Sequence, residues 1–184
     1  MNILVGYASA HGSTAEIARF MGAIFQEHHF QVHVADVESL GAADGYAAVI
    51  LGSAIHAGTI LPSMRTYVRR HKDDLTLKSV YFWIACIRVI EPGGCRHARE
   101  NYIPYEIAPG INPARVAAFS GRVELAELQP GERWALALDY DGTQPSEPFD
   151  GDYRDWDAIR AWTLEVAAEL STPQSSSESS IAAN

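Results

Sequence analysis

The chain has 184 residues, of which 47% are hydrophobic and 20% charged, and a formal net charge of −9. These values are typical of one soluble globular domain with a complete core. An acidic chain lacks the concentrated basic surface that nucleic acids require, and it is a poor candidate for binding an anionic membrane unaided.

The first residues, Met1-Asn2-Ile3-Leu4-Val5, are followed at once by glycine and polar residues, without the basic and long apolar regions of a signal peptide. No stretch approaches the ~20 apolar residues that span a bilayer. Two cysteines, Cys86 and Cys95, do not make a disulfide framework in a domain of this size. We therefore expect a cytoplasmic protein without an integral membrane segment.

Strand-like and helix-like segments alternate along the chain. In chain order, apolar runs and helical spacing predict a strand at 3–8, a helix at 14–28, strands at 31–36 and 46–53, a helix at 60–72, a strand at 80–86, a polar helix at about 95–107, a strand at 115–121 that could continue to 128, and a closing helix at 153–170. Trp83 falls within one of these strands and is expected in the core.

Strands that are joined through helices need crossover connections, so the sheet is expected to be parallel with helices on both faces. Five such strands favour the doubly wound order 2-1-3-4-5 over a (β/α)8 barrel, which needs about 250 residues. Residues 129–152 contain prolines and glycines without an apolar period and predict a long surface insertion. Residues 172–184 have the composition of a disordered tail, so the domain is expected to span residues 1–171.

The loop Ser9-Ala10-His11-Gly12-Ser13-Thr14 lies between the first strand and the first helix. In a parallel α/β sheet, ligands bind beyond the carboxyl ends of the strands, at the topological switch point. The loop supplies three hydroxyls, one glycine and the free N–H groups of a helix N-terminus, which suit a phosphate dianion without a positive side chain. The alternative is a turn that only caps the helix, with Ser13 as the N-cap.

Features that the loop lacks exclude several classes of phosphate ligand. Gly12 is followed directly by Ser13, so the lysine of a nucleoside triphosphatase loop is missing, and the dinucleotide pattern G-x-G-x-x-G is absent as well. The loop also contains no cysteine that could act as a phosphatase nucleophile. A single monophosphate is the ligand that remains.

Residues 7–18, Tyr-Ala-Ser-Ala-His-Gly-Ser-Thr-Ala-Glu-Ile-Ala, resemble the phosphate signature of flavodoxins, which bind flavin mononucleotide (FMN). Residues 49–58 and 118–122 most resemble the branch that contains the flavodoxin-type, menaquinone-linked protoporphyrinogen dehydrogenase, and Asp155-Trp156-Asp157 fits the same branch. The resemblance covers residues 1 to about 170 and implies the flavodoxin-like α/β fold, FMN as cofactor and a link to porphyrin biosynthesis.

The resemblance also implies which residues bind the cofactor. The phosphate would be held by Ser9, Ala10, His11, Gly12, Ser13 and Thr14, the first isoalloxazine loop would be Ser53, Ala54, Ile55, His56, Ala57 and Gly58, and the second loop would run from Cys86, Ile87 and Arg88 to about residue 94.

Flavodoxins that act as carriers place the flavin between aromatic side chains, and this sequence departs from that pattern. The first loop offers only the ring of His56, and the second loop offers none. One flavin face would then be open for a substrate, which favours an enzyme, with His56 and Arg88 as catalytic candidates. The alternatives are a solvated loop histidine and a surface arginine paired with Glu91.

Two further features concern metals and partners. His28, His29, His33, His71 and His97 show no ligand spacing with cysteines or carboxylates, so no metal is predicted. An acidic run comprises Asp139, Asp141, Glu147, Asp150, Asp152, Asp155 and Asp157. This run could dock a basic redox partner or could be a solvated loop before the last helix. The dehydrogenase has a basic, aromatic insertion near this point, so the acidic run weakens the expectation of quinone use and membrane association.

Three functions are therefore left open. The first is an FMN-dependent oxidoreductase that passes electrons from a flat reduced substrate to a quinone or another acceptor. The second is an electron carrier between a reductase and a partner protein. The third is a binding module without flavin.

Overall fold

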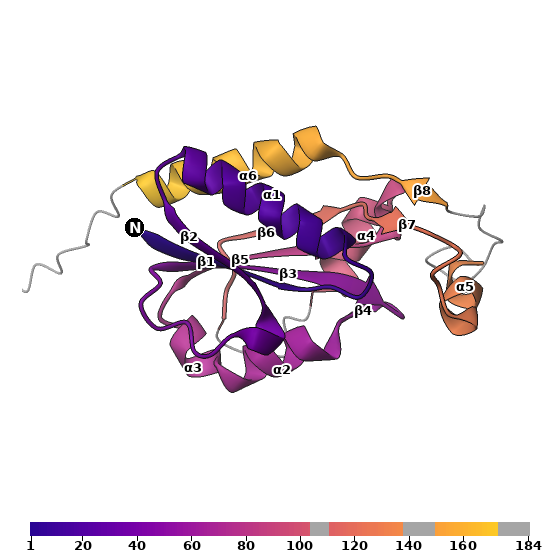
Figure 1. The fold of residues 1–184 in the computed structure, drawn as a ribbon, viewed down its shortest axis with the longest axis horizontal. Coiled ribbons are helices and arrows are strands. Elements are labelled where there is room, and N and C mark those ends of the chain that lie inside the picture. The colour runs from indigo at the N-terminus through magenta and orange to yellow at the C-terminus, as the bar shows by residue number, and fades with distance from the viewer. Residues whose placement is uncertain (104–110, 138–149, 173–184) are drawn as a thin grey trace, which may run out of the picture.

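The computed structural model describes residues 1–103, 111–137 and 150–172. Its centre is a sheet of parallel strands in the order β2-β1-β3-β5-β6 (Figure 1). The strands are β1 (Asn2–Ala8), β2 (Gln31–Asp36), β3 (Ala48–His56), β5 (Ser79–Ala85) and β6 (Arg115–Phe119). Numbered among themselves, these five strands have the order 2-1-3-4-5, so the predicted topology is confirmed.

Helices cover both faces of the sheet (Figure 1). On one face lie α1 (Ser13–Glu27) and α6 (Trp156–Ser171), and on the other α2 (Pro62–Arg70) and the single turn α3 (Lys72–Leu75). Each face has its own core. The first contains Ile17, Met21, Phe25, Ile159, Trp162 and Val166, and the second contains Met64, Tyr67, Val68, Leu75 and Ala98.

The predicted core position of Trp83 is confirmed, because its side chain is fully buried. Gly52 lies opposite it on β3. A Cβ atom at Gly52 would lie 2.0 Å from Trp83 Cε2, so only glycine leaves room for the indole ring. This close approach fixes the packing of β3 against β5 near the carboxyl ends of both strands.

The structure corrects several predicted boundaries. A short strand β4 (Thr59–Ile60) pairs antiparallel with β3 and was not predicted. The helix α4 (Gly94–Asn101) ends before the predicted residue 107, and residues 104–110 lie outside the described ranges. β6 ends at Phe119, and the chain then forms β7 (Arg122–Val123), which pairs antiparallel with β8 (Gly151–Asp152). The predicted continuation to 128 is therefore wrong, because the chain leaves the main sheet at Ser120.

The region predicted as an irregular insertion begins with a helix, α5 (Pro130–Leu136). Proline at its first position suits a helix start, and the backbone N–H of Gln129 donates to Glu132 Oε2 at 2.7 Å. The spacing of Gln129, Pro130 and Glu132 was a usable signal for this helix. Residues 138–149 of the predicted insertion and 173–184 of the predicted tail lie outside the described ranges.

Two single turns of 3₁₀-helix complete the description, η1 (Val37–Ser39) and η2 (Ile87–Ile90). Within the described ranges, no helix combines the length and the apolar character needed to cross a membrane.

Candidate cofactor site

The turn between β1 and α1 is shaped by Ser9 and Gly12. The backbone N–H of Gly12 donates to Ser9 Oγ at 3.1 Å, and Gly12 adopts the left-handed conformation with φ of 85°. A non-glycine residue there would pay a conformational penalty of about 1–2 kcal/mol. A Cβ atom at Gly12 would meet nothing within 4 Å, so the requirement for glycine is conformational and not steric.

The N-terminus of α1 has no side-chain cap, and its N-cap residue is Gly12. The interpretation of Ser13 as the N-cap is therefore wrong. The first N–H groups of a helix lack intrahelical partners and carry a partial positive charge. Ser13 and Thr14 are the first two residues of α1 and carry hydroxyls at this end of the helix, and Thr14 is only 1% exposed. The residues present thus fit a phosphate dianion.

A cavity of about 290 Å³ opens in front of this turn. Its volume is at the low end of small-molecule sites. Nine of the predicted residues line it: Ala10, His11, Ser13, Thr14, Ala54, Ile55, His56, Ala57 and Ile87. The structure therefore joins the phosphate loop and both predicted isoalloxazine loops in one cavity.

Other predicted site residues have structural positions instead. Ser53 is buried; its Oγ donates to the carbonyl of Ala54 and accepts a hydrogen bond of 3.0 Å from the backbone N–H of Leu61. These bonds fix the end of β3 against the start of α2. Gly58, with φ of 72°, lies in the turn between β3 and β4. Both residues shape the first loop without lining the cavity.

In the second loop, Cys86 and Arg88 are buried, and neither lines the cavity. Burial raises the pKa of the Cys86 thiol to about 11, so a thiolate is disfavoured at neutral pH. Arg88 Nη1 lies 2.6 Å from Glu91 Oε1, which is the pairing that the alternative interpretation expected, although Arg88 is buried and the pair is only partly accessible. The geometry gives Arg88 a role in shaping the loop.

Several residues around the cavity were not predicted from the sequence. Apart from Ala85 at the end of β5, they are Gly121, Arg122, Val123, Glu124, Glu127, Leu128, Gly131, Glu132 and Leu136. They belong to the segment that follows β6, which includes β7 and α5. Apolar spacing could not place this segment over the cavity, because its position depends on the pairing of β7 with β8.

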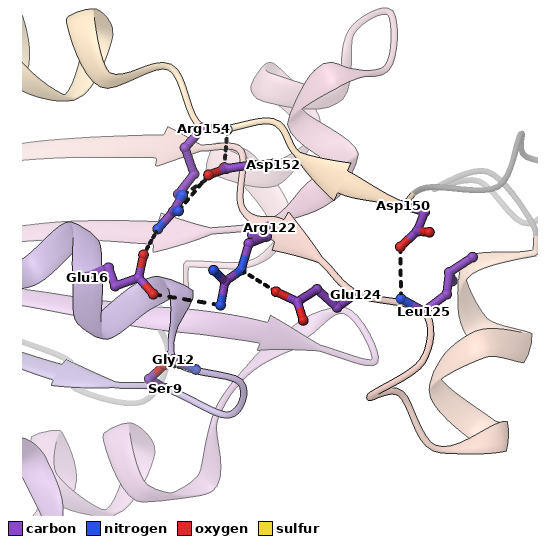
Figure 2. Close-up of polar contacts among 9 residues, drawn as sticks. All are labelled: Ser9, Gly12, Glu16, Arg122, Glu124, Leu125, Asp150, Asp152 and Arg154. Atoms are coloured by element: carbon purple, nitrogen blue, oxygen red, sulfur yellow. Dashed lines mark hydrogen bonds and ion pairs between the residues drawn. The ribbon is translucent and has the colours of Figure 1, made fainter.

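Arg122 and Arg154 connect this segment to α1 (Figure 2). Arg154 Nη1 lies 2.6 Å from Glu16 Oε2, and Arg154 Nη2 lies 2.6 Å from Asp152 Oδ2. Arg122 Nε lies 3.0 Å from Glu124 Oε1, and Arg122 Nη2 lies 3.7 Å from Glu16 Oε1. The Arg154 side chain is only 4% exposed, and its guanidinium lies over the ring of Trp156. Its hydrogen bonds lower the pKa of Glu16 and Asp152.

The acidic run expected at 139–157 is only partly within the described ranges, which exclude Asp139, Asp141 and Glu147. Asp150 accepts a hydrogen bond of 3.1 Å from the backbone N–H of Leu125 (Figure 2). Asp155 caps α6 by accepting from the N–H of Ala158. The carboxylates of Asp150, Asp152 and Asp155 therefore stabilise the chain's own backbone and ion pairs.

One cluster joins two predicted residues to α5. His11 Nε2 lies 3.0 Å from Glu132 Oε1, and His56 Nδ1 lies 3.5 Å from the same oxygen. The two imidazole rings are stacked, with centroids 5.7 Å apart. The bond from the Gln129 N–H, followed by the contact with His11, lowers the pKa of the Glu132 carboxyl. Glu132 therefore carries a negative charge at the wall of the cavity.

The comparison with protein families agrees with the fold. The family model described as the flavodoxin domain matches residues 4–145, which is more than half of the chain. The chain belongs to this family. No curated protein matches the chain.

Solved structures share the fold at low sequence identity. Flavodoxin 1 from Bacillus cereus is 17% identical with a TM-score of 0.60, over 93% of this chain and 100% of that one. The flavodoxin of Fusobacterium nucleatum, solved bound to FMN, is 15% identical with a TM-score of 0.54, over 91% and 98%. Rubredoxin oxygen:oxidoreductase from Desulfovibrio gigas is 13% identical with a TM-score of 0.56, and this chain covers 36% of its length. These similarities establish the flavodoxin-like fold.

Proposed function

We propose that the protein binds FMN in the cavity beside the phosphate turn and transfers electrons with it. The observation that carries this proposal is the uncapped N-terminus of α1, which lies with two hydroxyls at the same cavity as the first and second loops. A helix N-terminus of this kind favours a phosphate dianion. Membership of the flavodoxin-domain family supports the same cofactor.

Different residues would bind the phosphate and the ring system of the cofactor. Ser13, Thr14 and the first N–H groups of α1 would hold the phosphate, and the loop residues 54–57 together with Ile87 would contact the ring system. FMN supplies the electron and hydride chemistry when it is bound. The chain would orient the cofactor, and Leu128 and Leu136, which also line the cavity, would limit its contact with water.

We favour an oxidoreductase of the protoporphyrinogen dehydrogenase-like branch over a carrier. Among the described residues that line the cavity, none is phenylalanine, tyrosine or tryptophan. Among these described residues, only the imidazoles of His11 and His56 could then lie against the flavin, and we infer that one face is left to a flat reduced substrate. A quinone is one candidate acceptor, with porphyrin biosynthesis as the corresponding process.

A specific observation keeps the carrier as the second candidate. Trp134 on α5 is 73% exposed, although α5 borders the cavity through Glu132. Exposed tryptophans beside a functional site are frequent anchors in protein interfaces. A redox partner docked there would lie close to the cofactor.

The first test uses the visible spectrum of the purified protein. We expect bands near ~370 and ~450 nm from an oxidised flavin, and binding of added FMN by protein from which the flavin has been removed. Riboflavin, which lacks the phosphate, is the matched ligand and should bind more weakly. Equal affinity for the two ligands, or no binding of either, would contradict the assignment of the phosphate turn.

The second test separates the enzyme from the carrier. Oxidation of protoporphyrinogen by the FMN-loaded protein with a quinone acceptor supports the enzyme. Reduction of a partner protein by a flavodoxin reductase, dependent on added protein and without protoporphyrinogen turnover, supports the carrier.

A further inference from the structure

We propose that His11, His56 and Glu132 form a binding site for one divalent first-row transition metal ion, with Zn²⁺ as the first ion to test. The ligand atoms of these residues all lie within 4.8 Å of one another. They come from three separate parts of the chain: the phosphate turn, the end of β3 and α5. The spacing of these residues in the sequence could not indicate that they lie together.

Two of the three distances between ligand atoms are close to those found around a metal ion, and all three atoms lie within 4.8 Å of one another. Bonds of 2.0–2.1 Å at tetrahedral angles place two ligand atoms about 3.3 Å apart. The contacts of Glu132 Oε1 with His11 Nε2 and His56 Nδ1 are 3.0 and 3.5 Å. Two imidazole nitrogens and a carboxylate oxygen form a donor set that Zn²⁺ and its neighbours accept.

The carboxylate of Glu132 is held in place by its second oxygen. Oε2 accepts the 2.7 Å hydrogen bond from the backbone N–H of Gln129, which leaves Oε1 directed at the two imidazoles. Metal-binding carboxylates are commonly oriented by such a hydrogen bond to the oxygen that does not bind the ion. The start of α5 therefore acts as support for the ligand.

A cation also resolves the electrostatics of the cluster. The cavity is lined by Glu124 and Glu127 as well as Glu132, against one arginine, Arg122. A divalent ion would offset this negative charge at the place where a phosphate-bearing ligand has to enter.

Three protein ligands leave at least one coordination position open. All three residues line the cavity, so the open position faces its interior. An ion in this site would also tie α5 to the two cofactor loops. The proposed metal site depends only on the contacts among His11, His56 and Glu132, and it does not require that FMN is bound.

The test uses the full chain, freed of metal with a chelator and then dialysed. Zn²⁺ is titrated by calorimetry, and Co²⁺ is added as a spectroscopic probe because its visible absorption depends on its ligands. We expect one ion per chain. His11→Ala, His56→Ala and Glu132→Gln should each weaken binding by about tenfold or more.

Controls separate the loss of a ligand from misfolding. Glu132→Gln retains a side-chain oxygen that can accept from Gln129, and circular dichroism checks the fold of each variant. His33→Ala removes a histidine whose Nδ1 is bonded to Tyr46 Oη, and it should bind as the wild type does. Absence of binding by the wild type, or equal binding by all variants, overturns the site.

The outcome is distinguishable from that of the proposed function. Metal binding by a protein that ignores FMN would contradict the flavin assignment alone. FMN binding by a protein that ignores Zn²⁺ and Co²⁺ would contradict the metal site alone.

Discussion

Arg154 and Glu16 join the start of the last helical segment to the helix that follows the phosphate turn. The Arg154 Nη1 atom lies 2.6 Å from Glu16 Oε2, although 138 residues separate the two positions. Glu16 is in the first turn of α1, and Arg154 follows β8. The contact holds the β7–β8 ribbon, whose Arg122 and Val123 line the cavity, against the phosphate side of the site (Figure 2).

We expect Arg154→Met to lower the free energy of unfolding by about 1–3 kcal/mol, because it removes the charge-assisted hydrogen bonds of a buried guanidinium to Glu16 and Asp152 and its contact with the Trp156 ring. Chemical denaturation monitored by circular dichroism measures the change. Arg160→Met is the matched control, since Arg160 Nη1 lies 3.8 Å from Glu27 in an exposed pair. Exposed pairs contribute little, so this variant should change stability by at most about 0.5 kcal/mol. Equal effects in the two variants would contradict the structural role of Arg154.

The same network predicts a pH dependence of stability. Hydrogen bonds from Arg154 lower the pKa of Glu16 and Asp152 from their ordinary values of 4.5 and 3.8. A carboxyl with a lowered pKa in the folded state contributes stability above its unfolded pKa. This contribution is lost as the pH falls below 4.5 and 3.8 toward the folded values.

The denaturation midpoint of the wild type should therefore fall on acidification through this window. In Arg154→Met the fall should be smaller, because the unfolded and folded pKa values of both carboxyls become more alike. Other carboxyls, Glu132 included, contribute equally to both proteins. Parallel pH profiles of the wild type and the variant would show that Arg154 does not control these pKa values.

Gly52 provides a prediction about the core beneath the site. Gly52→Ala should lower the free energy of unfolding by about 1–3 kcal/mol, because the new methyl overlaps the Trp83 indole. Gly41→Ala is the control, since a Cβ atom there meets nothing within 4 Å. Denaturation measures both, and the near-ultraviolet circular dichroism of Trp83 should change only in the first variant. An unchanged spectrum for Gly52→Ala would contradict the predicted displacement of the indole.

Much of the fold could be predicted because its signals are local. The buried strands are short apolar runs, and the face of α6 shows Ile159, Trp162 and Val166 at helical spacing. The phosphate turn was also predictable, since one glycine and three hydroxyls lie together in the sequence. The predicted ends of elements were wrong where tertiary contacts determine them. One example is Ser120, whose Oγ donates to the carbonyl of Tyr153.

The contribution of α5 to the site could not be predicted for the same reason. His11, His56 and Glu132 are distant in sequence, and only the docking of α5 brings their ligand atoms together. Arg88 illustrates the opposite case. Its type and its loop suggested a position near the flavin, but pairing with Glu91 draws it into the interior. The sequence offered the pairing with Glu91 as an alternative, but residue type and spacing did not decide between the two positions.

Thr14 gives the sharpest prediction for the phosphate turn. Thr14→Val should weaken FMN binding by about 1–3 kcal/mol, or roughly 5- to 150-fold, because a charged phosphate oxygen loses a hydrogen-bond donor. Valine has nearly the same shape, so the buried environment of the side chain is preserved. The change should be much smaller for riboflavin, which has no phosphate to lose the contact. Fluorescence quenching of the flavin on binding measures both ligands.

Thr66→Val, at an exposed position on α2, is the matched control and should leave both affinities unchanged. An equal loss for FMN and riboflavin in Thr14→Val would place the hydroxyl away from the phosphate and attribute its effect to packing. Unchanged FMN affinity in that variant would show that the amides of α1 and the remaining hydroxyls suffice. Because Thr14 is almost completely buried at the uncapped end of α1, we expect the phosphate-specific loss.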